Sequence, residues 1–318
     1  MSVREAVIGI DTSNYTTSVA IMGIDGAPMA NIKRLLPVDA GQCGLRQSDA
    51  LFAHVKALPV LMREAEPLLA DLEIRAVGVS TRPRNVEGSY MPVFLAGCAV
   101  AESLSATMGV PLYSFSHQCG HIMAAICSAG RLDLLDNEFT ALHASGGTTE
   151  LLRVKGTGHG FSAELIGGTL DLNAGQVIDR VGVMLGMPFP CGRHLEAEAL
   201  RFEGVPHRPA ISRKGMHINL SGVENMAERL RRDGKDAPEI AAFVLDYVGR
   251  AVEKIIAESV AVYGKGPIVC AGGVMCNSII RRMLQSKHDV YFAEPDMSSD
   301  NAVGIAALAL HSYKAAGR

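Results

Sequence analysis

Two histidines one helical turn apart carry the strongest chemical signal in this sequence of 318 residues. His117 and His121 form an HxxxH pair, which on a helix places both imidazoles on one face, where they can share a metal ion. Asp300, in a polar turn before the last apolar helix, is the candidate third ligand. Two histidines and an aspartate with open coordination positions suit one divalent ion, iron or zinc. In the alternative interpretation the histidines are structural and Asp300 caps the helix.

Three turns rich in small polar residues are candidates for binding a nucleotide. They span residues 11–14, 145–149 and 271–277. Glycine and serine let a backbone approach a phosphate, and consecutive N–H groups form an anion nest. Asp11 is the candidate catalytic residue, because it could hold a metal-bound water or orient a nucleophile. Ordinary hairpin turns or tight strand–helix packing are the alternatives.

The proposed nucleotide pocket combines these turns. We expect phosphate at the Ser145-Gly146-Gly147-Thr148 loop and adenosine near Gly272 and Gly273, with the two turns facing each other across a cleft. Asp179 could reach a ribose hydroxyl, and the turn that contains Gly192 could line the same pocket. The sequence has no GxxxxGK[ST] and no GxGxxG motif, so neither a P-loop NTPase nor a Rossmann dehydrogenase is supported.

Two hairpins of the same design position these turns and indicate an internal duplication. Residues 6–23 and 139–156 each combine an apolar strand, a turn of small residues, a Thr-Thr pair and a second strand. A length prior of roughly 150 residues per domain also favours two domains. We therefore predict an α/β protein with two like domains and a cleft between them. They cover residues 1–130 and 131–318, the second with an inserted segment around 204–236.

Apolar periodicity supplies the remaining elements of both domains. Strands are expected at residues 75–80 and 109–116, and helices at 49–69, 95–108, 174–186, 193–202, 237–263 and 277–285. The segment 204–236 is rich in Arg, Lys, His, Pro and Gly, which predicts a loop or mobile cover.

Composition narrows the class of protein. The formal charge of −3 argues against gripping nucleic acid by bulk positive charge. No apolar run reaches about 18 residues and no signal peptide is evident, so we expect no membrane span. The seven cysteines include no CxxC pair, which favours a reducing cytoplasm.

Seven segments, in this order along essentially the whole chain, resemble the TsaD family of threonylcarbamoyl-adenosine synthase subunits. That family was formerly described as O-sialoglycoprotein endopeptidase or glycoprotease. The matching segments are GIDTSNYTTSVAI, FAHVKALPVLM, HQCGH, ASGGTTEL, TLDLNAGQVIDRVGVMLGMPFPCG, AGGVMCNSIIRRML and SSDNAVGIAALA.

The resemblance implies the duplicated fold of actin, Hsp70 and sugar kinases. It implies an acyltransferase that moves a threonylcarbamoyl group from its adenylate to the adenosine beside the tRNA anticodon. ATP or the acyl-adenylate would be the bound nucleotide, with tRNA and TsaB-like and TsaE-like companion proteins as partners. By motif, the metal ligands would be His117, His121 and Asp300, and the adenylate-binding residues would be Ala144 to Thr148, Asp179, Gly192 and Asn277.

Several family motifs are altered at the site itself, which indicates a diverged paralogue. The family's SGGHT is SGGTT in this sequence, and its HxEGH is HQCGH. The acids that follow TLD in the family are replaced by Leu172, Asn173 and Gln176. The family's loop TAGPG is replaced by the basic segment TRPRNVE, in which Arg82-Pro83-Arg84 could bind an anion. We therefore expect weak or no transfer by the isolated protein, with nucleotide binding retained. The alternative is a non-catalytic or altered-specificity nucleotide-binding partner in a modification complex. A metallopeptidase is disfavoured because HExxH is absent.

Overall fold

Each half of the chain builds a mixed β-sheet in the computed structural model, which describes residues 4–13, 15–38, 45–157, 160–298 and 300–317. The first sheet has the order β3-β2-β1-β4-β5. Its strands are β1 (Arg4–Thr12), β2 (Thr16–Gly23), β3 (Pro28–Leu35), β4 (Leu72–Arg82) and β5 (Leu112–Ser116). Strands β1 to β3 form an antiparallel meander, whereas β4 runs parallel to β1 and β5 parallel to β4.

The second sheet repeats this order and extends it, as β12-β11-β6-β7-β8-β10-β9. Its strands are β6 (Glu138–Ala144), β7 (Thr149–Thr157), β8 (Gly160–Thr169), β9 (Arg213–Lys214), β10 (His217–Ile218), β11 (Ile268–Ala271) and β12 (Val290–Phe292). Strands β6 to β8 are again an antiparallel meander, and β11 and β12 are again parallel additions. The duplication predicted from the two hairpins is confirmed, because β1–β2 and β6–β7 occupy equivalent places.

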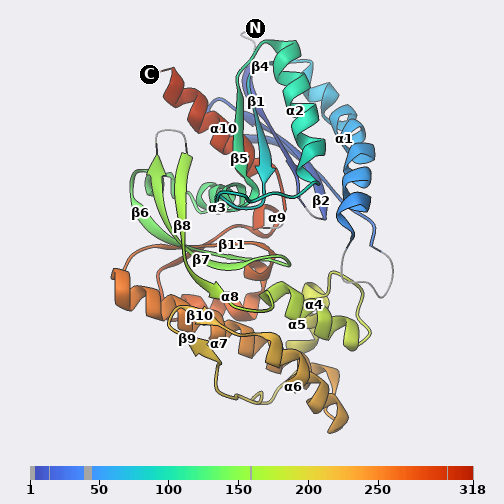
Figure 1. Ribbon diagram of the computed structural model, residues 1–318, viewed down its shortest axis with the longest axis vertical. Helices are drawn as coiled ribbons and strands as arrows, with labels where there is room; N and C mark the ends of the chain where they lie inside the picture. Colours follow the sequence, from blue (N-terminus) through green and yellow to red (C-terminus); the bar gives the residue numbers. More distant parts are fainter. Residues whose placement is uncertain (1–3, 14, 39–44, 158–159, 299, 318) are drawn as a thin grey trace.

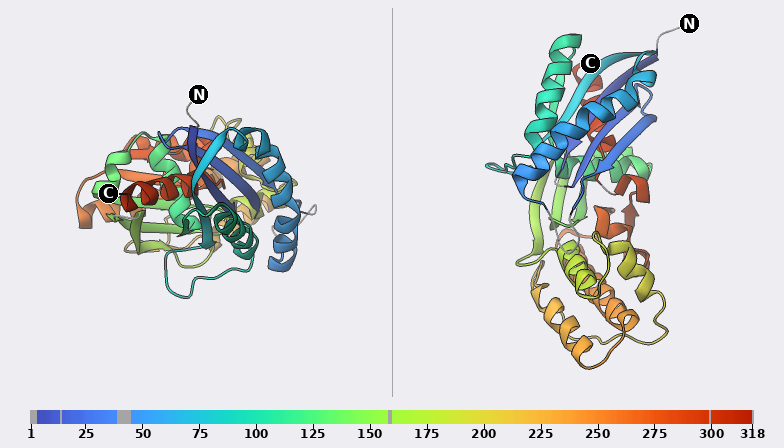
Figure 2. Two further views of the ribbon diagram at one scale, coloured as in Figure 1. Left: turned by 90° about the horizontal axis from the view of Figure 1, so that it is seen from above. Right: turned by 90° about the vertical axis from the view of Figure 1, so that its right-hand side faces the viewer.

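Helices flank both sheets, so that the molecule has two lobes along its long axis (Figures 1 and 2). The helices are α1 (Gln47–Leu69), α2 (Phe94–Met108), α3 (His117–Ser128), α4 (Ala174–Met184), α5 (Gly192–Ala199), α6 (Ser221–Arg232), α7 (Ala237–Tyr263), α8 (Ser278–Gln285), α9 (Pro295–Ser298) and α10 (Val303–Ala316), with short 3₁₀ helices at Leu132–Asp136 and Gly273–Cys276. The expected loop at 204–236 is wrong in part, because α6, β9 and β10 form there. The apolar residues Val223 and Ala227, one turn apart, anchor α6 in the core.

Helices α3 and α10 join the two halves and set the geometry of the site. Helix α10 comes from the end of the chain but packs on β1 and β4, while α3 packs on β11 and β12 as well as on α10 (Figure 1). Their contact is very close, since a Cβ at Gly304 would lie 1.8 Å from the carbonyl oxygen of Gly120. Glycine at both positions therefore lets the start of α10 approach the histidine-bearing helix.

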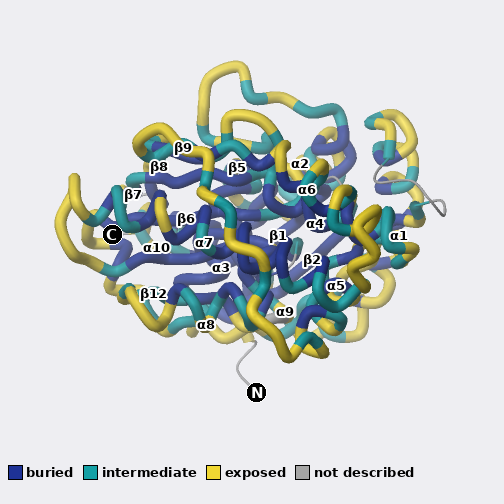
Figure 3. Tube along the Cα trace, turned by 90° about the horizontal axis from the view of Figure 1, so that it is seen from below, coloured by how far each residue is buried: buried dark blue, intermediate teal, exposed yellow. Residues whose placement is uncertain are grey.

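The central strands β1, β2 and β6 are almost wholly buried (Figure 3), and apolar residues of both sheets pack against these helices. A further apolar cluster contains residues of β1, α3, β6 and α10, so the core is continuous across the two halves. The boundary between residues 1–130 and 131–318 remains a prediction. No helix in the described part of the chain combines the length and apolar content needed to cross a membrane.

Candidate functional site

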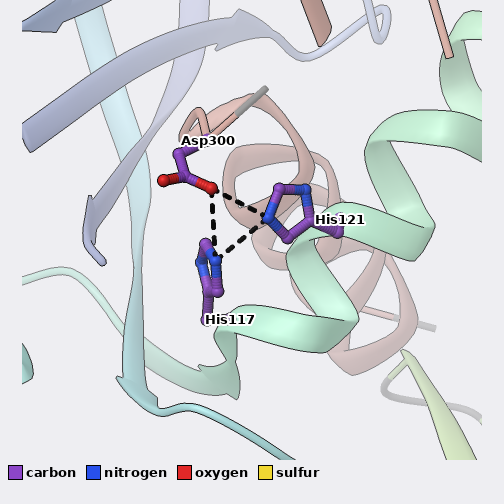
Figure 4. Close-up of side chains that lie close together, drawn as sticks. All are labelled: His117, His121 and Asp300. Atoms are coloured by element: carbon purple, nitrogen blue, oxygen red, sulfur yellow. Dashed lines mark hydrogen bonds and ion pairs between the residues drawn. The ribbon is translucent and has the colours of Figure 1, made fainter. Parts of the chain in front are cut away.

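Helix α3 starts at His117 and presents both histidines to the segment before α10. The Ser116 hydroxyl caps this helix by accepting a hydrogen bond from the Cys119 amide at 3.2 Å. His117 Nε2 lies 3.0 Å from His121 Nε2, and Asp300 Oδ1 lies 3.2 Å from the His121 and 3.6 Å from the His117 nitrogen (Figure 4). The three residues predicted as metal ligands therefore converge on one point.

This donor set fits a divalent ion. Ligand atoms held at about 2.0–2.2 Å from one ion lie roughly 2.8–3.6 Å from each other in tetrahedral or octahedral geometry, which spans the three separations observed. Asp11 Oδ1 lies 3.0 Å from His117 Nδ1, so that ring can donate to the carboxylate and turn the lone pair of Nε2 toward the ligand cluster. Asp11 is fully buried on β1. Asp11 therefore contacts His117 at Nδ1, on the side of the ring away from the ligand cluster, and orients the ring.

The electrostatics of the site follow from this packing of carboxylates and imidazoles. Burial opposes a charged imidazole at His117, but Asp11 and Asp300 outweigh it and raise the pKa of His117 to about 10. Burial likewise opposes the charged form of Asp300, yet hydrogen bonds to the two histidines hold its pKa well below the usual value. His143, on β6, lies beside His121 with the ring centroids 4.7 Å apart. Burial lowers the pKa of His143 well below its usual value, and its ring is neutral at pH 7.

The loop after β6 offers backbone donors for an anion. It is closed by a bond from the Ser145 amide to the Thr148 carbonyl at 2.8 Å. The amides of Gly146, Gly147 and Thr148 donate to no acceptor within the residues that the structure describes. The start of α4 packs against this loop, where the Gly175 amide bonds the Ser145 carbonyl, so the positive end of the helix dipole lies beside it.

One cavity of about 500 Å³ joins the loop to the ligand cluster. Its described lining comprises Ser13, Tyr15, residues 83–84 and 86–91, Phe94, His117, residues 145–148 and Asp300. Both halves of the chain thus contribute to its lining. Ser13 comes from the 11–14 turn, as predicted, whereas Asn14 lies outside the described residues.

The remaining predicted site residues lie outside this described lining. Strands β6 and β11 are parallel neighbours, so Gly272 and Gly273 follow the same sheet edge as residues 145–148. A Cβ at Gly272 would lie 2.4 Å from the Ala144 carbonyl oxygen. The expectation that the two turns face each other across the cleft is therefore wrong; adjacent strands place them on one wall.

Three further predicted site residues lie in the second half of the chain, outside the described lining of the cavity: Asn277, Asp179 and Gly192. The Asn277 side-chain oxygen accepts from the Ile279 and Ile280 amides and caps α8. Asp179 accepts from the Cys191 amide at 2.8 Å, and burial raises the pKa of its carboxyl. Gly192 begins α5. Their predicted roles in holding a nucleotide stay predictions.

Sequence reasoning missed Tyr15, His143 and His54. Tyr15 lines the cavity, and His54 is buried with its Nδ1 2.8 Å from the Thr17 hydroxyl. Single histidines on a strand or a helix carry no spacing signal. The one sequence feature that could have indicated His143 is its position directly before the segment Ala144–Thr148, which was predicted to bind the nucleotide.

Comparison with known proteins now decides the family. The sequence model described as "TsaD: tRNA N6-adenosine threonylcarbamoyltransferase" matches residues 48–307, most of the chain. This chain belongs to the TsaD family. A curated relative in Neorickettsia sennetsu, described as a tRNA N6-adenosine threonylcarbamoyltransferase, is 29% identical over 324 residues. That alignment covers 97% of this TsaD-family chain and 94% of the relative.

Solved structures confirm the predicted actin-, Hsp70- and sugar-kinase-like fold of this TsaD-family member. Full-length HypF in a phosphate- and nucleotide-bound form matches with a TM-score of 0.62 at 12% identity, over 98% of this chain and 46% of HypF. The activator of 2-hydroxyisocaproyl-CoA dehydratase from Clostridium difficile gives 0.55 at 13% identity, covering 98% and 97% of the two chains. A ROK family glucokinase from Streptomyces griseus gives 0.51 at 13%, covering 96% and 99%. At these identities the likeness concerns the fold alone.

Proposed function

We propose that this chain is a metal-assisted tRNA threonylcarbamoyltransferase that takes its acyl group from an adenylate. The observation that carries this proposal is one cavity that joins two kinds of group. It is lined by His117 and Asp300 of the ligand cluster and by the 145–148 loop, whose amides at residues 146–148 have no acceptor among the described residues. The family match supports transfer to an adenosine in tRNA.

The ligand cluster would hold one divalent ion, iron or zinc. His117, His121 and Asp300 would be the ligands, and the contact of Asp11 with His117 Nδ1 would leave Nε2 free to bind the ion. An ion bound there supplies Lewis-acid polarisation of a carbonyl oxygen.

The backbone of the 145–148 loop would bind the adenylate phosphate. Its amides and the N-terminus of α4 favour a negative group at this point, so they also stabilise the phosphate as it leaves. In the reaction, the exocyclic amine of adenosine forms a C–N bond to the carbamoyl carbon, the C–O bond to phosphate breaks, and the amine loses one proton. The protein contributes mainly by holding donor and acceptor in line.

Reconstitution with tRNA, the threonylcarbamoyl-adenylate source and TsaB-like and TsaE-like companion proteins tests this function. The readout is threonylcarbamoyl-adenosine in digested tRNA, measured by mass spectrometry. We expect His117→Ala with His121→Ala to abolish both bound metal and product, and the matched variant His194→Ala, at an exposed histidine of α5, to retain both. Product formation by the double variant at the wild-type rate would contradict the proposal.

A nucleotide-binding partner without transfer activity is the second candidate, because the altered motifs change side chains around the site. Cys119, which replaces the acid of HxEGH, is buried in the apolar core, and burial raises the pKa of its thiol. Gln176 serves to cap α4 through the Asn173 amide at 3.0 Å. ATP binding without metal and without product in the reconstitution would favour this candidate.

A further inference from the structure

The loop between β4 and α2 carries a charged residue into the cavity. Two bonds brace this segment: the Pro83 carbonyl accepts from the Gln118 amide at 3.0 Å, and the Arg84 amide donates to the Ser89 hydroxyl at 3.0 Å. Arg84 and Ser89 both line the cavity. The segment is therefore tied to the start of α3, the helix that carries the two histidines.

The side chain of Arg84 is held in place from one side. Its Nε lies 2.9 Å from Glu150 Oε1, and Glu150 is buried on β7. The second carboxylate oxygen of Glu150 accepts a hydrogen bond from Gln118 Nε2 at 2.5 Å. A guanidinium has five N–H donors. The four on Nη1 and Nη2 of Arg84 meet no acceptor within the described residues, so this side chain is oriented and still has donors to offer.

The charge of Arg84 acts close to the ligand cluster. Arg84 lines the same cavity as His117 and Asp300. Arg84 is the single lysine or arginine among the described lining residues of the cavity. Glu87, also in the lining, is exposed and has the opposite charge, so an anion would enter on the Arg84 side.

We propose that Arg84 binds the carboxylate of the amino-acid portion of the transferred group and so sets the specificity for an acidic acyl donor. The inference rests on the proposed function, because a threonylcarbamoyl group is joined through its nitrogen and keeps a free carboxylate. A planar guanidinium matches a carboxylate with two parallel hydrogen bonds. The adenylate phosphate, the other available anion, is assigned to the amides of residues 145–148.

Binding measurements on the metal-loaded, full-length protein separate these anions. The probes are N-carbamoyl-L-threonine, its neutral carboxamide and AMP, titrated into wild type, Arg84→Gln and Arg82→Gln by calorimetry. Arg82 is the matched control, because it bonds Asn85 and Thr81 and lies outside the described lining. We expect wild type and Arg82→Gln to prefer the carboxylate over the carboxamide by about 10- to 100-fold, as charge-assisted hydrogen bonds allow.

Arg84→Gln should bring this preference close to one while AMP binds as in wild type. A preference that survives in Arg84→Gln, or is lacking in wild type, overturns the inference. An equal loss of AMP affinity in Arg84→Gln also overturns it, because the arginine would then serve the phosphate. Glu150→Gln should reduce the preference by a smaller factor, since Arg84 keeps its charge and loses its orientation. Failure of the proposed function looks different: the carboxylate preference depends on Arg84, yet no modified adenosine forms in tRNA.

Discussion

Metal binding at the His117–His121–Asp300 cluster should strengthen steeply as the pH rises from about 6 to about 8. The carboxylates of Asp11 and Asp300 outweigh burial and raise the pKa of His117 to about 10. Below that pH the metal-free site keeps a proton on His117, and an ion must displace it because metals bind neutral imidazole. Each displaced proton changes the apparent dissociation constant by about tenfold per pH unit, or roughly 100-fold over this range.

The stability of the metal-free protein should change in the opposite direction. A folded-state pKa above the unfolded value of 6.5 stabilises the fold fully below pH 6.5, and this contribution is lost as the pH rises through about 10. Thermal unfolding of metal-free protein should therefore move to lower temperature with rising pH, whereas the metal-loaded protein should not show this loss.

Calorimetric titration with Zn²⁺ in two buffers of different ionisation enthalpy measures the released protons directly. We expect close to one proton per ion at neutral pH. Asp11→Asn removes the largest favourable charge acting on His117, so its pKa falls and fewer protons are released. An affinity that is independent of pH, or a proton count unchanged by Asp11→Asn, would refute this account of the site.

Three further outcomes follow from the packing and the cavity. Gly146→Val should keep its thermal stability, because a Cβ at this position meets no neighbouring atom. The variant should lose nucleotide binding, because its side chain would occupy the space proposed for the phosphate, and titration with ATP measures this loss. Gly304→Ala should destabilise the fold by about 1–3 kcal/mol or more, since its Cβ would clash with the Gly120 carbonyl where α10 meets α3. Denaturant unfolding measures this loss, with exposed Gly222→Ala as the comparison, because an added Cβ there meets no neighbour. Threonylcarbamoyl transfer should be weak while ATP binding persists, and reconstitution with tRNA, the threonylcarbamoyl-adenylate source and the companion proteins measures both. Turnover equal to that of an ordinary family member would contradict the divergence inferred from the motifs.

Most of the fold could be predicted from the sequence, because both copies of the duplicated unit show the same short pattern of apolar strands and polar turns. The helix expected at 237–263 matches α7 residue for residue, since apolar spacing and the Asp236 cap define it locally. Strand β8 and helix α6 were missed. Strand β8 alternates weakly because glycines and exposed residues interrupt it, and the charged face of α6 resembles a loop in composition.

The site was accessible in part for the same reason. The histidines at i and i+4 share a helical face whatever the tertiary structure, and the motif order supplied Asp300. The relation between the two glycine turns needed the strand order, because only the pairing of β6 with β11 shows that they share a wall. Arg84 drew notice as part of a basic loop, but its partner on β7 lies far along the chain.

The basic loop that stands in place of the family's TAGPG is tied to α3 through a residue of β7. Gln118 follows His117 and donates to Glu150, and Glu150 pairs with Arg84 in the loop that replaces the family's TAGPG. Arginine at residue 84 alone would bring an unpaired charge to the mouth of the cavity, and Glu150 alone would be a buried carboxylate without a cation. Each is stabilised by the other. Residues of α3 and β7 therefore hold the basic loop at the cavity, where Arg84 adds a positive charge to the lining shared with His117 and Asp300.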